Sequence, residues 1–118
     1  MRDATLVEAI NAALARAMQE DERVLVLGED VGKDGGVFRA TDGLLARFGP
    51  ARVFDTPVAE AAIAGMSVGL AAQGFCPVAE IQFMGFAYAA IDQLLNHAAR
   101  LRTRTRGRLS CPMVLRTP

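Results

Sequence analysis

The chain has 118 residues, of which 52% are hydrophobic, and its 13 lysine and arginine residues balance 13 aspartate and glutamate residues. This composition excludes disorder for the chain as a whole, and the length allows one core that buries roughly 65% of the unfolded surface. A formal net charge of zero gives no overall field that would attract nucleic acid or an anionic membrane. We therefore expect one globular domain, or part of one, that binds no nucleic acid and no membrane.

The sequence also lacks the usual signals for a membrane span, secretion or a metal knuckle. The longest stretch of the apolar middle without a charge or amide covers residues 61–72, which is short of the about 20 residues that a span needs. The N-terminus has no apolar core of the secretory type, and two cysteines, Cys76 and Cys111, are too few for a disulfide framework. We expect a cytoplasmic protein with no metal site on this chain.

Helices and strands are expected to alternate along the whole chain. Thr5 and Glu8 form a capping box at the start of an amphipathic pattern, and a short apolar run ended by Gly28 is typical of a strand buried on both faces. In chain order, the expected elements are a helix over 5–18, a strand over 24–27, a short helix over 41–48 capped by Thr41, a strand over 52–55, a helix from Thr56, its cap, to about Gln73, a strand over 78–83, a helix over 86–101 and a strand over 113–115.

This alternation predicts an α/β fold, in which an open parallel sheet is covered by helices and ligands bind at the carboxyl ends of the strands. Residues 32–36 combine glycines with charges and are expected to form a mobile loop at that edge. The chain stops directly after the last expected strand with no element to cover it. We therefore expect a truncated domain.

Glu60 is the first candidate for chemistry, because it lies in the opening turn of a helix that follows a strand, between Val58 and Ile63. One interpretation is that its carboxylate only stabilises the helix N-terminus, by about 0.3–1 kcal/mol. The other is that a carboxyl group among apolar side chains shares or donates a proton. From the residues alone, the structural interpretation is favoured.

Two further carboxylates are candidates, one after the first strand and one inside the third. Glu29 follows the first strand, and Glu80 lies in the third strand on one face with Val78 and Gln82. A buried carboxylate without a partner is costly, so we expect Glu80 to be paired for structural reasons. Gln82, near the strand end, either contacts a ligand or only satisfies a loop.

The remaining candidates have structural interpretations as well. Phe83, Phe86 and Tyr88 are expected in the core, with a stacking role at the strand end left open for Phe86. His97 has no second ligand and no activated Ser or Cys, so we expect a surface or interface histidine. Arginine occurs at every second position from 100 to 108 without interleaved aromatic residues, which favours a solvated or subunit-facing segment over a nucleic-acid site.

Several ordered motifs together resemble one family. They are LGEDVG at 27–32, GGVFRAT at 35–41, RVFDTPVAE at 52–60, GF at 74–75, PVAEIQF at 77–83 and IDQ at 91–93. In this order they are similar to the β subunit of the thiamine diphosphate-dependent E1 component of 2-oxo acid dehydrogenases, across essentially the whole chain. The resemblance implies a pyrimidine-binding domain of transketolase-like architecture, of which residues 1–118 are the N-terminal part, with the family's C-terminal transketolase-like domain absent.

The resemblance also implies roles for five residues. In this family, the glutamate that matches Glu60 hydrogen-bonds N1′ of the cofactor's aminopyrimidine and promotes the proton transfer that activates the thiazolium ring. The resemblance thus assigns a catalytic role to Glu60, in place of the helix-dipole interpretation. By the same match, Glu29, Val58, Glu60, Gln82 and Phe86 bind the cofactor, with Phe86 against the ring, Gln82 in polar contact and Glu29 behind or beside Glu60.

The family's assembly implies the partners. Thiamine diphosphate is shared with an E1 α subunit in an α2β2 heterotetramer, and Mg²⁺ and the diphosphate are held mainly by the α subunit, whose Gly-Asp-Gly motif does not occur here. The enzyme decarboxylates a 2-oxo acid oxidatively and transfers the acyl group to the lipoyl group of an E2 acyltransferase. This short chain is expected to be inactive without the α subunit.

Pyruvate is the favoured substrate, because residues 37–41 and 81–86 look nearer to bacterial pyruvate enzymes. A branched-chain 2-oxo acid is the alternative. A different class of function is a non-catalytic assembly module, in which the Ala/Gly-rich helix and the arginine segment bind a partner.

Overall fold

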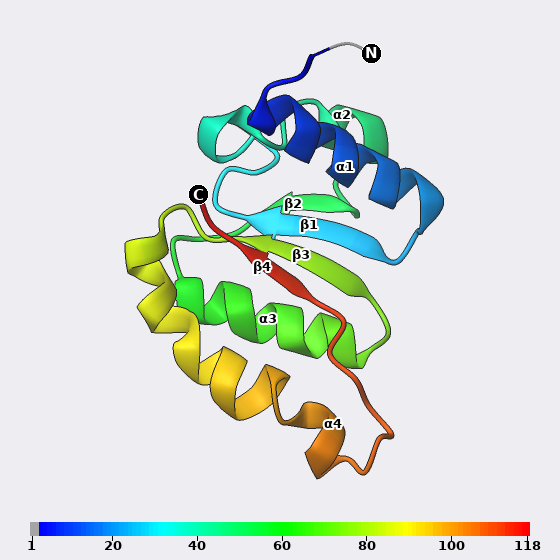
Figure 1. The fold of residues 1–118 in the computed structure, drawn as a ribbon, viewed down its shortest axis with the longest axis vertical. Coiled ribbons are helices and arrows are strands. Elements are labelled where there is room, and N and C mark those ends of the chain that lie inside the picture. Colours follow the sequence, from blue (N-terminus) through cyan, green and yellow to red (C-terminus); the bar gives the residue numbers. More distant parts are fainter. Residues whose placement is uncertain (1–2) are drawn as a thin grey trace.

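The structure is a computed structural model that describes residues 3–118, and it contains a four-stranded parallel sheet with helices on both faces (Figure 1). The strands are β1 (Val24–Gly28), β2 (Val53–Asp55), β3 (Cys76–Glu80) and β4 (Val114–Arg116), in the spatial order β2-β1-β3-β4. The helical elements are α1 (Leu6–Glu20), η1 (Val37–Arg39), α2 (Leu44–Phe48), α3 (Glu60–Ala72), η2 (Met84–Ala90), η3 (Gln93–Ala98) and α4 (Leu101–Arg104). The predicted α/β fold with a parallel sheet is confirmed.

On one face of the sheet lie α1 and α2 (Figure 1). The start of α1 is fixed by the predicted capping box, in which the Glu8 N–H donates to the Thr5 hydroxyl over 3.3 Å and the Thr5 N–H donates to the Glu8 carboxylate over 2.8 Å. The core on this face consists of Leu14, Ala15, Met18, Val26, Val31, Leu44 and Val53.

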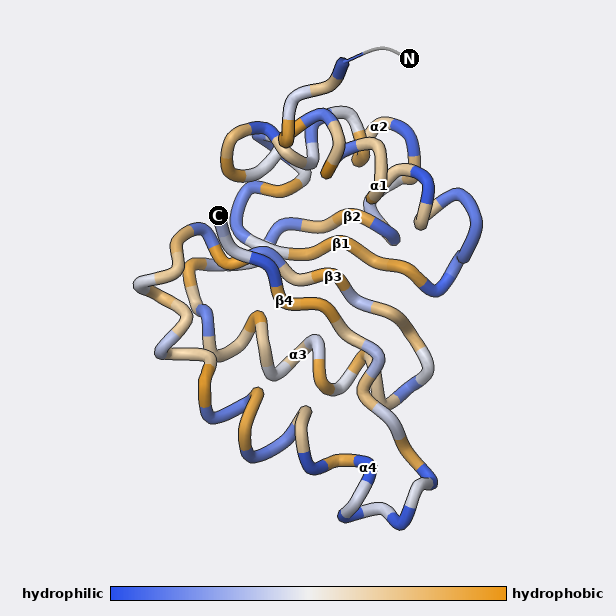
Figure 2. The backbone as a smooth tube through the Cα atoms, viewed as in Figure 1, coloured by the Kyte–Doolittle hydropathy of each residue, from blue (hydrophilic) through white to orange (hydrophobic). Residues whose placement is uncertain are grey.

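On the other face, α3 packs against the sheet, with η2 and η3 packed against α3. Its core contains two clusters, Leu27 with Ile63 and Ala79, and Ala64 with Ile81 and Ala90. Figure 2 shows that the strands are mainly hydrophobic, while blue segments lie in the turns and loops and along the helices. No helix in residues 3–118 combines the length and the apolar character required to cross a bilayer.

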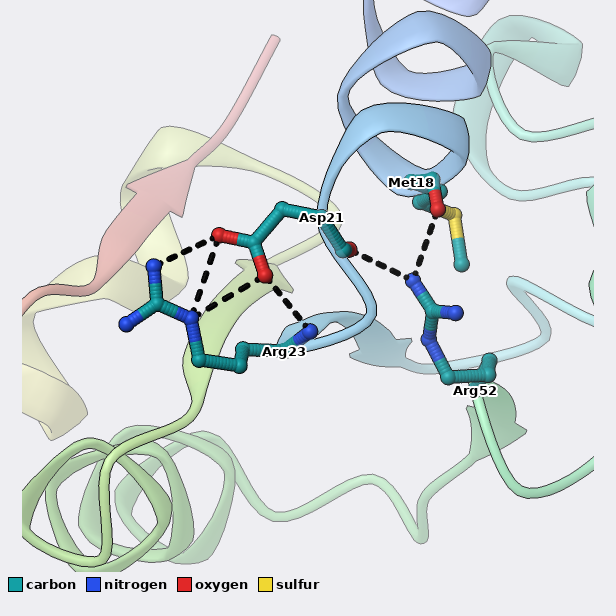
Figure 3. A network of polar contacts seen from close by, with 4 residues as sticks. All are labelled: Met18, Asp21, Arg23 and Arg52. Atoms are coloured by element: carbon teal, nitrogen blue, oxygen red, sulfur yellow. Dashed lines mark hydrogen bonds and ion pairs between the residues drawn. The ribbon is translucent and has the colours of Figure 1, made fainter.

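The turn between α1 and β1 is held by the guanidinium of Arg52 (Figure 3). Its Nη2 donates to the carbonyl oxygens of Met18 and Asp21, each over 3.0 Å, and its Nε donates to the carbonyl of Val24 over 2.8 Å. The last carbonyls of a helix have no partner within the helix. A side chain from the start of β2 therefore satisfies the C-terminal end of α1 and ties it to the sheet.

Two predicted helix caps are wrong, because both threonines bind elsewhere. The Thr56 N–H donates to the Gly28 carbonyl over 2.9 Å, which prolongs the pairing of β2 with β1, and α3 begins only at Glu60. The Thr41 hydroxyl donates to the Val31 carbonyl over 2.6 Å, and α2 begins after Gly43.

Two predicted elements differ in extent or type. The strand expected over 78–83 ends at Glu80. The residues after Glu80 therefore leave the sheet, although their side chains were expected to continue alternating between its two faces. The single helix expected over 86–101 is divided into the 3₁₀ segment η2 and the π-helical segment η3, followed by α4. Both η2 and η3 pack on α3, so an apolar face is expected along this segment whichever of these helix types it adopts.

The loop expected at 32–36 is present, and it is connected to distant parts of the chain. The N–H groups of Gly32 and Lys33 donate to the carboxylate of Asp55, at the end of β2, over 2.7 Å and 3.2 Å. Gly35 is buried, and its carbonyl accepts from the Thr41 N–H over 2.9 Å. The loop is thus hydrogen-bonded to Asp55, which lies far from it in sequence, and local composition does not reveal this contact.

Candidate functional site

The strands all point to one edge of the sheet, where the loop after β1, the start of α3 and the start of η2 meet (Figure 1). Glu29 follows the last residue of β1, and Glu60 is the first residue of α3. No side chain caps α3, so the first N–H groups of this helix face the edge without a side-chain acceptor. The fold thus brings two carboxyl groups from distant parts of the sequence to the positive end of a helix.

Glu29 is a buried acid that contacts a second acid. Its side chain is 2% exposed, and its Oε1 accepts no hydrogen bond from residues 3–118. Burial raises the pKa of Glu29, and the negative charge of Glu60, a hydrogen bond between the two carboxyls and the charge of Asp30 raise it further. Glu29 is therefore easier to protonate than an exposed glutamate, and its protonated carboxyl has a proton to donate to the half-buried Glu60.

An exposed aromatic pair lies on the segment that follows β3. The rings of Phe83 and Phe86 are 6.1 Å apart in an edge-to-face arrangement, and the two residues are 50% and 51% exposed. In the 3₁₀ geometry of η2, residues three apart lie on the same side, which explains this pairing. The prediction that Phe83, Phe86 and Tyr88 lie in the core is wrong, because β3 ends too early to carry them into it.

The five predicted site residues all lie on segments at the carboxyl edge. The side chains of Glu29 and Glu60 contact each other, as stated above. Val58, just before α3, is 80% exposed, and Gln82 is half-buried between β3 and the aromatic pair.

Sequence reasoning missed the partner of Glu80. The expectation that this carboxylate is paired is confirmed, since it forms an ion pair with Arg116 of β4 and accepts from the Val37 N–H over 2.8 Å. Arg116 could not be named in advance, because the pairing depends on the register between β3 and β4. The sequence offered one signal for this partner, which was an arginine directly after the last expected strand.

The other candidates lie away from the paired glutamates. His97 is 3.8 Å from the carboxylate of Asp92 and is half-exposed. The arginines at 100–108 are exposed, as expected, and none forms an ion pair within residues 3–118. Met66 and Met84 are 41% and 62% exposed. The described part of the chain gathers no group of three or more His, Cys, Asp or Glu side chains that could hold a metal ion.

Known proteins resemble this chain along nearly its whole length. It is 60% identical over 114 residues to a protein named "3-methyl-2-oxobutanoate dehydrogenase subunit beta" from Mycobacterium tuberculosis, covering 97% of this chain and 33% of the relative. It is 55% identical over 114 residues to a "Pyruvate dehydrogenase E1 component subunit beta" from Acholeplasma laidlawii, covering 97% and 35%. It is 51% identical over 112 residues to a "2-oxoisovalerate dehydrogenase subunit beta" from Bacillus subtilis, covering 95% and 34%.

A solved structure shows the same likeness. A chain described as "Split gene transketolase, inactive beta4 tetramer" is similar with a TM-score of 0.59 at 30% identity, over 75% of this chain and 28% of that chain. The present chain spans about a third of the length of the curated relatives it matches. Residues 2–118 match the family described as "Transketolase, pyrimidine binding domain". The chain belongs to this family.

Proposed function

We propose that this chain is the pyrimidine-binding part of the E1 β subunit of a 2-oxo acid dehydrogenase, which binds thiamine diphosphate together with an α subunit. The observation that carries the proposal is the contact between the buried, protonation-prone Glu29 and Glu60 at the start of α3. The β-subunit relatives at 51–60% identity support it. Residues 1–118 would form the N-terminal part of the pyrimidine-binding domain, and the family's C-terminal domain is not among them.

The residues at the carboxyl edge fit an aminopyrimidine ring. Such a ring is flat and aromatic, and it carries nitrogen acceptors beside an amino donor. Phe83 and Phe86 offer exposed aromatic surface for stacking, and Val58 offers an apolar contact. The carboxyls of Glu29 and Glu60 and the amide of Gln82 supply the donors and acceptors. Glu29 Oε1 is buried and accepts no hydrogen bond from residues 3–118, so it can accept one from a bound ring.

In this proposal, Glu29 and Glu60 handle a proton as a pair. Burial and the negative charge of Glu60 raise the pKa of Glu29, so Glu29 binds a proton more readily and can pass it toward Glu60. Glu60 then holds a proton at N1′ of the aminopyrimidine, which is the catalytic role that we assign to it. When bound, thiamine diphosphate supplies the electron sink for decarboxylation of the 2-oxo acid.

The rest of the cofactor site would come from the α subunit. We assign Mg²⁺ and the diphosphate to that subunit, because residues 3–118 bring together no cluster of metal-ligating side chains. The working form would be an α2β2 heterotetramer that passes the acyl group to the lipoyl group of an E2 acyltransferase. Both subunits would therefore be required for turnover.

Two 2-oxo acids are candidate substrates. Residues 37–41 and 81–86 favour pyruvate, whereas the Mycobacterium tuberculosis relative at 60% identity is named for 3-methyl-2-oxobutanoate. Decarboxylation of each acid by this chain mixed with a candidate α subunit identifies the substrate.

Glu60→Gln should lower the rate by about 100-fold or more, while Glu20→Gln, on an exposed part of α1, should leave it unchanged. Equal rates for wild type and Glu60→Gln would contradict the proton role, and a mixture that assembles without turnover would favour the assembly module.

A further inference from the structure

Glu80 lies at the centre of a row of residues that crosses three strands. Gly28 of β1 pairs with Glu80 of β3, and Glu80 pairs with Arg116 of β4. Glu80 is 1% exposed, and its carboxylate forms an ion pair with the guanidinium of Arg116. A buried charge is retained only with such partners, so the pair explains how Glu80 can be tolerated in the core.

The same carboxylate also holds the loop that follows Glu29. The Val37 N–H donates to Glu80 Oε1 over 2.8 Å. Gly36, with a φ of 69°, lies so close that a Cβ atom there would be 2.7 Å from Glu80 Oε1 and 2.8 Å from Thr41 Oγ1. Only glycine fits between the carboxylate and the hydroxyl, so this part of the loop is packed directly on Glu80.

The contacts of Glu80 reach both chain neighbours of Glu29. On one side, a Cβ atom on Gly28 would lie 2.6 Å from the carbonyl oxygen of Glu80, so the two backbones touch. On the other side, the Gly36 N–H donates to the carbonyl of Asp30 over 3.0 Å, and Gly36 precedes the Val37 that Glu80 binds. Two successive hydrogen bonds thus connect the Glu80 carboxylate to the residue after Glu29.

Asp30 has a backbone conformation that needs such support. Its φ of 54° lies in the left-handed region, which a residue other than glycine adopts at an energetic cost. Its carbonyl accepts from both the Asp34 and Gly36 N–H groups, which hold this turn in place. The turn directs the chain away from the sheet immediately after the buried Glu29.

We propose that Glu80 is a positioning residue for Glu29: through Val37, Gly36 and Asp30 it fixes the backbone that keeps the Glu29 carboxyl buried against Glu60. The catalytic meaning of this role rests on the proposed function. The positioning itself is a property of this chain and can be measured without cofactor or partner subunit. Failure of thiamine diphosphate binding and failure of this inference are therefore distinguishable.

Val37→Pro is the most selective test. Val37 is the first residue of η1, a position that suits proline, and the substitution removes the N–H that Glu80 accepts while leaving Glu80 and Arg116 intact. We expect the Gly36 amide to exchange with solvent at least tenfold faster. Because water then reaches the carboxyl, the pKa of Glu29 measured by ¹³C NMR titration should fall toward its ordinary value of 4.5.

Three further variants separate positioning from stability. Glu80→Ala should give the same changes, whereas Glu80→Gln keeps an acceptor for Val37 and should retain the wild-type Glu29 titration even though Arg116 loses its counterion. Met18→Ala, in the α1 core, should lower stability without altering the Glu29 titration. If Glu80→Ala does not fold, Val37→Pro decides. An unchanged Glu29 titration in folded Val37→Pro, or an equal change in Met18→Ala, would overturn the proposal.

Discussion

Glu29 is a buried acid whose protonation is tied to folding. Its pKa is raised in the folded chain, first by burial and then by Glu60, so the folded state binds more protons than the unfolded state above pH 4.5. Wild-type stability should therefore fall as the pH rises from 4.5 through the raised pKa. Glu29→Gln removes the titrating carboxyl and with it this pH dependence. The free energy of unfolding of the variant, relative to that of wild type at the same pH, should therefore increase between pH 5 and pH 8. Urea unfolding at both values measures it, and parallel pH profiles would contradict the assignment.

Asp21 shows the opposite behaviour at the surface. A side-chain hydrogen bond and then a backbone hydrogen bond from Arg23 lower the pKa of Asp21 to about 2 from its usual 3.8. The stabilisation is present above pH 3.8 and is lost as the pH falls toward 2. NMR titration of the Asp21 carboxyl should show the low midpoint, and Arg23→Ala should return it toward 3.8. A midpoint near 3.8 in the wild type would show that the pair does not persist in solution.

At the scale of elements, the hydrogen bonds of the Arg52 guanidinium to three carbonyl oxygens join α1 to the sheet (Figure 3). Arg52→Met removes three hydrogen bonds from a charged donor to carbonyls, so we expect a loss of about 2–4 kcal/mol in the free energy of unfolding. Arg47→Met is the matched control, because both guanidiniums stack on Phe48 but Arg47 donates only to the side chain of Gln19. Denaturant unfolding compares the two, and equal losses would show that the carbonyl contacts contribute little.

The packing of the loop after β1 gives a second element-scale prediction. Gly36 and Gly43 both have positive φ, 69° and 77°, but a Cβ atom would collide with Glu80 and Thr41 only at Gly36, since Gly43 has nothing within 4 Å. Gly36→Ala and Gly43→Ala should share a backbone cost of roughly 1–2 kcal/mol. Gly36→Ala should lose about 1–3 kcal/mol more. Equal losses in thermal unfolding would mean that the carboxylate and the loop separate easily.

Elements with a strong local pattern could be predicted from the sequence. The capping box of α1, the apolar run of β1 and the alternation of helices and strands were sufficient for the fold. That Thr41 and Thr56 cap no helix could not be predicted, because the Thr41 hydroxyl binds Val31 in the loop after β1 and the Thr56 N–H binds Gly28 of β1. The contacts of the loop at 32–36 could not be predicted for the same reason, since Asp55 lies far away in sequence.

The candidate site was predictable in part. Glu29 and Glu60 could be recognised by their places after a strand and at a helix start, and a parallel sheet brings such places to one edge. Their contact, and the exposure of Phe83 and Phe86, depend on where β1 and β3 end, which the sequence marks less clearly. Arg116 was missed because its role follows from strand register.

At the scale of the whole molecule, the carboxyl edge and the outer helical layer leave large apolar side chains exposed, among them Phe86, Tyr88 and Leu95. Tyr88 is the only tyrosine of the chain and is 75% exposed. If a partner subunit covers this surface, 3-fluorotyrosine incorporated into this chain alone should give one ¹⁹F resonance that shifts when a candidate α subunit is added. Phe75→Glu, an exposed position between α3 and β3 at the opposite edge of the sheet, should not affect this shift, whereas Leu95→Glu should weaken it. An unchanged resonance would contradict docking on this layer.

The central claim is that this chain supplies the aminopyrimidine half of a shared cofactor site through Glu60. Calorimetric titration of thiamine diphosphate with Mg²⁺ into the chain alone, and into its mixture with a candidate α subunit, tests it most directly. The account predicts binding in the mixture, none in the chain alone, and weaker binding with Glu60→Gln but not with Glu20→Gln. Binding in the mixture that is unaffected by Glu60→Gln, or no binding by a mixture shown to be folded and assembled, would contradict the account.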